Sequence, residues 1–197
     1  MPLQPFRVSP LFKEKVWAGR RLADLAWAEA PPAGTGEVWL VADLPGASGD
    51  VRDGPFQGRP LRDVVTERGA ELLGDGAADS GFPLLVKILD VGPPLSVQVH
   101  PNGEVARELG DGERGKCEAW LILSAEDDGL MFCGLREGIG SDDVPRLSRD
   151  GTLPEALNSF RPQAGEGVEI VPGTLHTAQG LLVLEVQESC DITYRVY

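Results

Sequence analysis

Hydrophobic and polar positions alternate along this chain in short runs, and this alternation predicts β-strands rather than long helices. The strands expected from the pattern cover residues 36–44, 83–91, 95–101, 116–125, 129–135, 167–176, 180–188 and 191–197. Short strands at roughly regular spacing are typical of an antiparallel sandwich or barrel. The 25 glycines and 16 prolines suit the many turns that such a fold requires.

Three stretches depart from the strand pattern and predict helical segments. Residues 58–74 place their apolar side chains on one face and carry Pro60 near the start, which favours a helix. Residues 141–160 contain two short segments with capping residues, which predicts a helical insert. Near the N-terminus, Ser9 and Pro10 form a plausible helix start. We therefore expect a mainly β fold with helical N-terminal and inserted segments.

The composition is that of one soluble domain spanning residues 1–197. A chain of 197 residues with 42% hydrophobic residues buries about 70% of its unfolded surface without needing a disulfide. The net charge of −13 disfavours binding to nucleic acid or to an anionic membrane. No signal peptide or apolar run of about 20 residues is evident. Cys117, Cys133 and Cys190 form no CxxC pair, so we expect a cytoplasmic protein.

Residues 95–101, "LSVQVHP", form a strand whose polar face carries Ser96, Gln98 and His100. The chain has only two histidines, and the other, His176, follows a Pro-Gly turn. A barrel brings such positions together with Glu118 of the next strand. Two imidazoles, a carboxylate and an amide oxygen suit Zn²⁺ and similar divalent ions. The alternative is that the two histidines are unrelated and partly buried.

A few cations stand where a cation is unexpected. Lys87 lies inside the apolar run "LLVKILDV", where a lysine is costly unless it reaches solvent or finds an anionic partner. Lys116 precedes Glu118 by two residues, although a loop lysine at a strand start is a simpler interpretation. Arg195 lies near Asp191, so its guanidinium either pairs with that carboxylate or binds a phosphate.

Four motifs then carry a resemblance to a known family. They are "PLLVKILDVGPPLSVQVHP", "GKCEAW", "VPGTLHTAQG" and "LVLEVQESCDITYRVY". In this order they resemble the type I mannose-6-phosphate isomerases, which are zinc cupins. Weaker similarities occur at "VWAGRRL" and "TGEVWLVAD". The resemblance covers most of the chain.

The resemblance implies a cupin-type jelly-roll β-barrel that holds one zinc ion per chain. The zinc ligands of the family fall on Gln98, His100, Glu118 and His176, the four residues that the spacing already singles out. The family normally continues with a second, smaller barrel, which is absent from the 197 residues. An open strand edge at the end of the chain is compatible with a homodimer.

The resemblance also implies interconversion of mannose 6-phosphate and fructose 6-phosphate through a metal-assisted enediol proton transfer. The predicted catalytic residues are Arg195, Lys116 and Glu185, and the predicted substrate-binding residues are Lys87, Ser96 and Asp191. Two alternatives are a sugar-phosphate-binding cupin without catalysis and a metal cupin of another class, such as a dioxygenase. The dioxygenase pattern of His-x-His is not met, because Gln98 stands in the first position.

Overall fold

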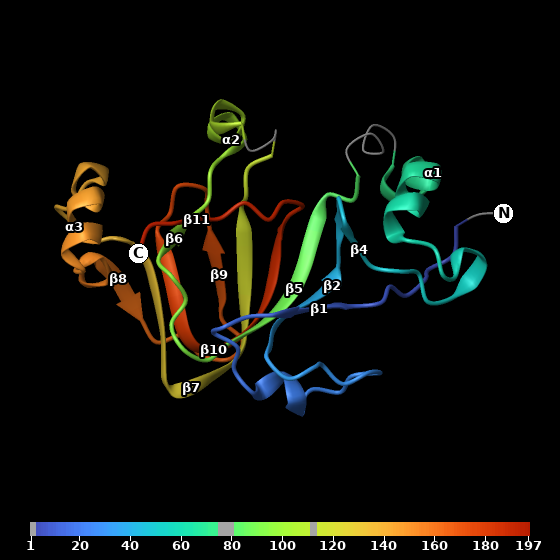
Figure 1. Ribbon diagram of the computed structural model, residues 1–197, viewed down its shortest axis with the longest axis horizontal. Coiled ribbons are helices and arrows are strands. Elements are labelled where there is room, and N and C mark those ends of the chain that lie inside the picture. Colours follow the sequence, from blue (N-terminus) through green and yellow to red (C-terminus); the bar gives the residue numbers. More distant parts are fainter. Residues whose placement is uncertain (1–2, 75–80, 111–113) are drawn as a thin grey trace.

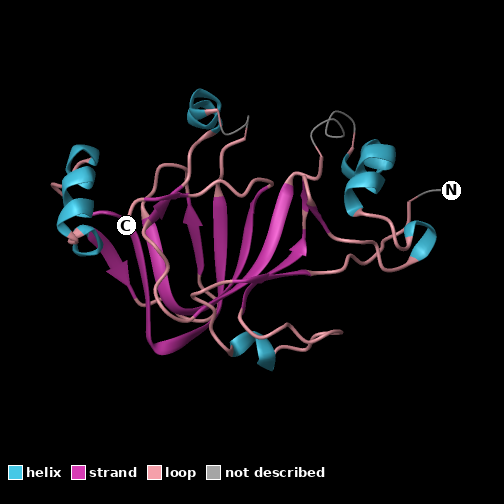
Figure 2. Cartoon of the chain, in the orientation of Figure 1, coloured by secondary structure: helices cyan, strands magenta, loops and turns pink. Residues whose placement is uncertain are grey.

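The structure, a computed structural model, describes residues 3–74, 81–110 and 114–197, and a curled β-sheet dominates it (Figures 1 and 2). The strands of the main sheet are β1 (Leu11–Glu14), β2 (Thr35–Val41), β5 (Leu84–Val91), β6 (Gln98–Val99), β7 (Glu118–Leu135), β8 (Leu157–Phe160), β9 (Gly167–Ile170), β10 (His176–Glu188) and β11 (Tyr194–Arg195). Strands β3 (Asp43–Leu44) and β4 (Ala47–Ser48) form a separate small hairpin. The expected mainly β fold is confirmed.

Helices lie at the periphery of the sheet (Figure 1). The α-helices are α1 (Leu61–Leu73), α2 (Gly103–Leu109) and α3 (Val144–Asp150). Short 3₁₀ helices cover Arg21–Asp24, Gly54–Phe56, Ser141–Asp143 and Leu153–Ala156. In the described part of the chain, no helix has the length and apolar character needed to cross a membrane.

Strand β10 organises the sheet, because it pairs with β5, β6 and β7, each time antiparallel. Its register with β7 jumps between Gln179, which lies opposite Leu130, and Leu181, which lies opposite Ala125. Residues 126–129 therefore bulge out of the pairing, and such a bulge bends and twists a strand. The two strands expected at 116–125 and 129–135 are the two halves of β7 on either side of this bulge.

The interior of the curled sheet is filled by side chains from alternate positions of each strand. On β7, Trp120 and Ile122 are buried, whereas Leu121 and Leu123 are 40% and 36% exposed. The largest cluster of buried apolar residues is Leu89, Val91, Leu95, Trp120, Ile122, Met131, Ile170, Ala178, Leu181 and Val183. The same alternation puts Glu118 and Glu185 inside, so the inner face changes from apolar to charged toward one end.

The predicted boundaries need several corrections. The helix start at Ser9 is wrong, because Leu11–Glu14 is strand β1, which pairs with β2. The insert at 141–160 is helical only to residue 156, after which Leu157–Phe160 forms β8 beside β7. The strand expected at 167–176 breaks after Ile170, because Gly173 adopts a turn with φ of +86°, so His176 starts β10.

Two further differences concern residues 95–109. Of the expected strand at 95–101, only Gln98–Val99 pairs as a strand, with His176 on one side and β11 on the other. Helix α2 follows and was not expected from the sequence. The Asn102 side chain accepts a hydrogen bond from the backbone of Val105, which caps its first turn. The helix predicted at 58–74 is confirmed as α1.

A buried ion pair fastens the N-terminal segment to the sheet. Asp90, on β5, has no exposed side-chain surface and accepts hydrogen bonds from Arg21 Nε and from the backbone of Leu22, each at 2.9 Å. Arg21 also donates to the carbonyls of Gly180 and Val91. A buried carboxylate needs such partners, because leaving it unpaired removes its hydration without compensation.

Replacing Arg21 by Met is expected to destabilise the fold by ~3 kcal/mol, because Asp90 would stay buried without its partner. Arg20→Met, at the exposed neighbouring position, should change stability by less than ~0.5 kcal/mol. Urea unfolding of both variants measures the difference. Equal stability of the two variants would show that the Arg21–Asp90 pair does not anchor the segment.

Candidate metal centre and active site

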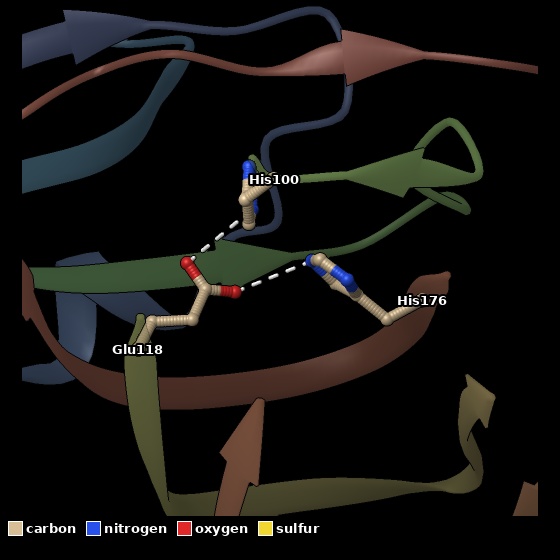
Figure 3. Close-up of side chains that lie close together, drawn as sticks. All are labelled: His100, Glu118 and His176. Carbon is tan, nitrogen blue, oxygen red and sulfur yellow. Dashed lines mark ion pairs between the residues drawn. The ribbon is translucent and has the colours of Figure 1, made fainter. Parts of the chain in front are cut away.

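Three buried side chains from distant parts of the chain converge inside the curled sheet (Figure 3). They are Glu118 at the start of β7, His100 just after β6, and His176 at the start of β10. Glu118 Oε1 lies 3.2 Å from His176 Nε2, and Glu118 Oε2 lies 3.5 Å from His100 Nε2. Their ligand atoms lie within 4.8 Å of one another, close enough to share one ion. The alternative that the two histidines are unrelated is therefore wrong.

The hydrogen bonds of the two imidazoles fix which ring nitrogen faces the centre. His100 Nδ1 lies 2.9 Å from the carbonyl of Ile192, and His176 Nδ1 lies 2.9 Å from the carbonyl of Thr174. Since a carbonyl can only accept, each Nδ1 carries the proton and each Nε2 keeps its lone pair. Burial lowers the pKa of His100, which keeps that ring neutral at neutral pH. Metal-binding histidines are commonly oriented in this way.

Gln98 lies beside this group on β6, directly opposite His176. Its amide Nε2 is 3.1 Å from His176 Nε2 and donates to that lone pair. A half-turn of the amide exchanges its nitrogen and oxygen, so Gln98 can instead offer a carbonyl oxygen to a cation. The structure thus brings all four predicted metal ligands together.

The charge at the centre favours a cation. Burial tends to raise the pKa of Glu118, but the neighbouring Lys116 ammonium favours the carboxylate and the pKa lies below its ordinary value, so Glu118 is an anion. Neither carboxylate oxygen has a hydrogen-bond partner of good geometry within the described chain, although Lys116 Nζ is 2.8 Å from Oε2. A buried anion facing two imidazole lone pairs is a donor set that suits zinc.

A cavity of about 780 Å³ opens next to the metal-ligand group. It is lined by all six predicted catalytic and substrate-binding residues, namely Lys116, Glu185, Arg195, Lys87, Ser96 and Asp191, and by Gln98. Lys116 lies between the cavity and the group, since its Nζ is also 3.2 Å from His100 Nε2. Lys116 stands in the loop just before β7, as the simpler interpretation has it, but the residue is only 3% exposed and faces the site rather than solvent.

Lys87 lies deep in the cavity wall and pairs with carboxylates. Its Nζ is 3.1 Å from Glu185 Oε1 and 3.5 Å from Asp191 Oδ1. Burial opposes the charge of Lys87, but Glu185, Glu37 and Asp191 outweigh it and raise the pKa of the ammonium. The side chain is 3% exposed, so it does not reach solvent as an edge-strand lysine would. The Glu185–Lys87 pair follows from the register, which places the two residues directly opposite each other on β10 and β5.

Arg195 lies on β11 opposite Gln98 and is exposed at the cavity. Asp191, the partner that the sequence suggested for it, pairs with Lys87 instead. Among the residues that the structure describes, no ion pair engages Arg195. Its guanidinium is therefore available to a ligand in the cavity.

Glu37 is a cavity residue to which the sequence analysis assigned no role. Its Oε1 is 2.9 Å from Lys15 Nζ, and its Oε2 accepts a hydrogen bond of 2.7 Å from Trp39 Nε1. Burial tends to raise the pKa of Glu37, but Lys87 and Lys15 outweigh burial and lower it. A signal was present in the sequence, because Glu37 lies in the strand "TGEVWLV", much as Lys87 lies in its apolar run.

The curled antiparallel sheet, which encloses a His-Glu-His group able to hold a metal and has a polar cavity beside it, is that of a cupin barrel. Residues 5–118 match the family model described as phosphomannose isomerase type I, catalytic domain. The chain belongs to the type I phosphomannose isomerase family.

Similar proteins agree with this assignment. The chain is 37% identical over 196 residues to the probable mannose-6-phosphate isomerase GmuF of Bacillus subtilis, covering 98% of this chain and 61% of that protein. It is 34% identical to the mannose-6-phosphate isomerase of Streptococcus mutans, covering 98% and 60%. The crystal structure of the mannose 6-phosphate isomerase from Bacillus subtilis superposes with a TM-score of 0.90 at 33% identity, covering 99% of this chain and 62% of that one. The chain thus spans about three fifths of the length of these relatives.

Glu37→Gln is expected to lower the free energy of unfolding at neutral pH. The reason is that Lys15 and Lys87 attract the Glu37 side chain only when its carboxylate is charged. Since its pKa in the folded state is below the ordinary 4.5, this stabilisation is fully present above pH 4.5 and is lost as the pH falls through the lowered value. The difference in free energy of unfolding between the parent chain and Glu37→Gln should therefore become smaller as the pH is lowered.

Urea unfolding at a series of pH values between neutrality and strong acid measures this gap. Glu29→Gln, at an exposed position, is the matched control and should show no comparable gap. A gap for Glu37→Gln that is independent of pH would contradict the charge-based account and indicate a packing defect.

Proposed function

We propose that this chain is a zinc-dependent aldose–ketose isomerase that interconverts mannose 6-phosphate and fructose 6-phosphate. The observation that carries the proposal is the arrangement of charges around one cavity. A His-Glu-His group lies behind Lys116, the carboxylates of Glu185 and Asp191 lie around Lys87, and the Arg195 guanidinium, which no ion pair engages among the described residues, lies at the exposed side. The names of the relatives support the same reaction.

In this proposal Glu185 carries the proton between the two carbons of the substrate. Its carboxylate takes the proton from C2 of the aldose, and the electron pair of that C–H bond becomes the C1–C2 double bond of an enediol. The proton is then returned to C1. Glu185 suits this role because it is buried, lines the cavity and is held at both oxygens, by Lys87 and by Trp120 Nε1 at 2.9 Å.

Lys116 exchanges protons with the oxygens on the same two carbons. Its ammonium supplies the proton that the carbonyl oxygen on C1 gains, and its amine takes back the proton that the hydroxyl on C2 loses. The position of Lys116, between Glu118 and the cavity, supports this assignment. One zinc ion held by Gln98, His100, Glu118 and His176 would supply a Lewis acid that stabilises negative charge on the sugar oxygens.

Arg195 is the group that we assign to the phosphate. It is exposed at the cavity and is not engaged by Asp191, whereas Lys87 and Lys116 already pair with carboxylates. Its planar fork can bind a phosphate through two hydrogen bonds. Ser96 and Asp191 stay predicted contacts of the sugar. A cytoplasmic location and a homodimer also stay predictions.

Glu118→Gln is expected to abolish stoichiometric zinc binding and isomerase activity together, because the variant removes the only charged ligand of the proposed set. Glu169→Gln, on the neighbouring strand β9 and exposed, should keep both. Metal analysis of the purified chains and a coupled assay of fructose 6-phosphate formation measure the two quantities. Retention of one zinc per chain by Glu118→Gln would contradict the four-ligand site.

Arg195→Met is expected to raise the KM for mannose 6-phosphate about 10- to 100-fold, since hydrogen bonds between charged groups contribute about 1.5–3 kcal/mol. Binding of zinc should not change. Arg146→Met, on the exposed face of α3, is the matched control. An unchanged KM in Arg195→Met would remove this residue from the phosphate site.

A further inference from the structure

Residues 188–193, from the last residue of β10 to the residue before β11, contact the site at several positions. Asp191 Oδ1 faces Lys87 Nζ at 3.5 Å, and the carbonyl of Ile192 accepts the hydrogen bond from His100 Nδ1 at 2.9 Å. Thr193 lines the cavity, and Arg195 follows on β11. We call residues 188–193 the connecting segment. Both the candidate metal centre and the cavity depend on where it lies.

Gln187 is the last inward-facing residue of β10 before the connecting segment, and it is 1% exposed. Its amide Nε2 donates to the carbonyl of Glu188 at 3.0 Å and to the carbonyl of Cys190 through a short hydrogen bond. Because both partners are carbonyls, the amide nitrogen must face them. The backbone of Cys190 also donates to the carbonyl of Glu188, at 2.7 Å. The Gln187 amide therefore fills the inside of a tight bend.

Packing alone does not account for a glutamine here. Gln187 Oε1 is buried and has no hydrogen-bond partner in the described residues. A buried polar atom without a partner costs about 1–3 kcal/mol, whereas an apolar side chain of similar shape would avoid that cost. The amide must therefore contribute through its N–H groups, and these point only to the bend.

Other contacts hold the start of the connecting segment against its neighbours. Glu188 Oε2 accepts from the backbone of Cys117 at 2.9 Å, the backbone of Ser189 donates to the carbonyl of Pro83, and Cys190 Sγ donates to the carbonyl of Gly115. The bond from Gln187 to the Cys190 carbonyl lies one residue before Asp191 and two before Ile192. It is therefore placed to set the direction in which the chain continues.

We propose that Gln187 is a positioning residue that holds the connecting segment, and through it orients His100 and places Asp191 and Arg195 at the cavity. The kinetic part of this inference rests on the proposed isomerase function. The part that concerns the hydrogen bond of His100 does not.

Gln187→Met is the informative variant, because methionine has nearly the same length but no N–H donor. Gln179→Met is the matched control, since Gln179 is a partly buried glutamine on the same strand. The full chain is labelled with ¹⁵N-histidine and studied by NMR. Its two histidines provide an internal comparison, because His100 Nδ1–H is bound to the connecting segment and His176 Nδ1–H to Thr174.

In Gln187→Met we expect the Nδ1–H signal of His100 to be lost through faster exchange with water, and the signal of His176 to persist. In the coupled assay we expect kcat/KM for mannose 6-phosphate to fall about tenfold or more, since small misplacements of active-site groups have effects of this size. Gln179→Met should resemble the parent chain in both measurements.

Two outcomes of the NMR measurement would overturn the inference. One is a persistent His100 signal in Gln187→Met, and the other is an equal loss of both histidine signals, which would indicate general loosening. If neither the parent chain nor the variants turn over mannose 6-phosphate, the proposed function fails, and the NMR comparison still decides the role of Gln187. Gln187→Glu, which turns acceptor oxygens toward two carbonyls, should disturb His100 at least as strongly as Gln187→Met.

Discussion

The buried carboxylate of Glu118 is the constraint on which the rest of the site depends. Its side chain has no exposed surface, and removing an ion from water costs several kcal/mol unless opposite charge and hydrogen bonds replace the hydration. Two imidazoles present lone pairs to it, so they cannot supply that charge. Lys116 supplies part of it, and a divalent cation would supply the rest. The strands that hold this group are joined through β10, which pairs with β6 and with β7.

A second group of charges lines the cavity, with two lysines set against three carboxylates. Lys87 shares its charge among Glu185, Asp191 and Glu37, and Lys15 pairs with Glu37. These pairs hold the carboxylates in place, which suits groups that must meet a substrate in one orientation. Because the cations of this group are engaged, the exposed Arg195 is left for an anionic ligand. In the proposed function, this charge pattern separates a metal end from a phosphate end.

Much of the fold, and the convergence of His100, Glu118 and His176, could be predicted from the sequence. Alternation of apolar and polar positions predicted the strands, and only two histidines had to be placed. What could not be predicted depends on register and on distant partners. The Lys87–Glu185 pair requires the alignment of β10 with β5, and the Arg21–Asp90 pair joins residues 69 positions apart. In the sequence alone, Gln187 looks like any other polar residue of a strand. Only the structure shows the bend at residues 188–190 that its amide fills.

The central claim is that Gln98, His100, Glu118 and His176 hold one zinc ion. X-ray absorption spectroscopy at the zinc edge of the zinc-loaded chain tests it most directly. The account predicts scattering from two imidazole rings and from oxygen ligands, all at about 2.0–2.2 Å. A sulfur shell at about 2.3 Å, or the absence of imidazole scattering, would place the metal elsewhere and contradict the account.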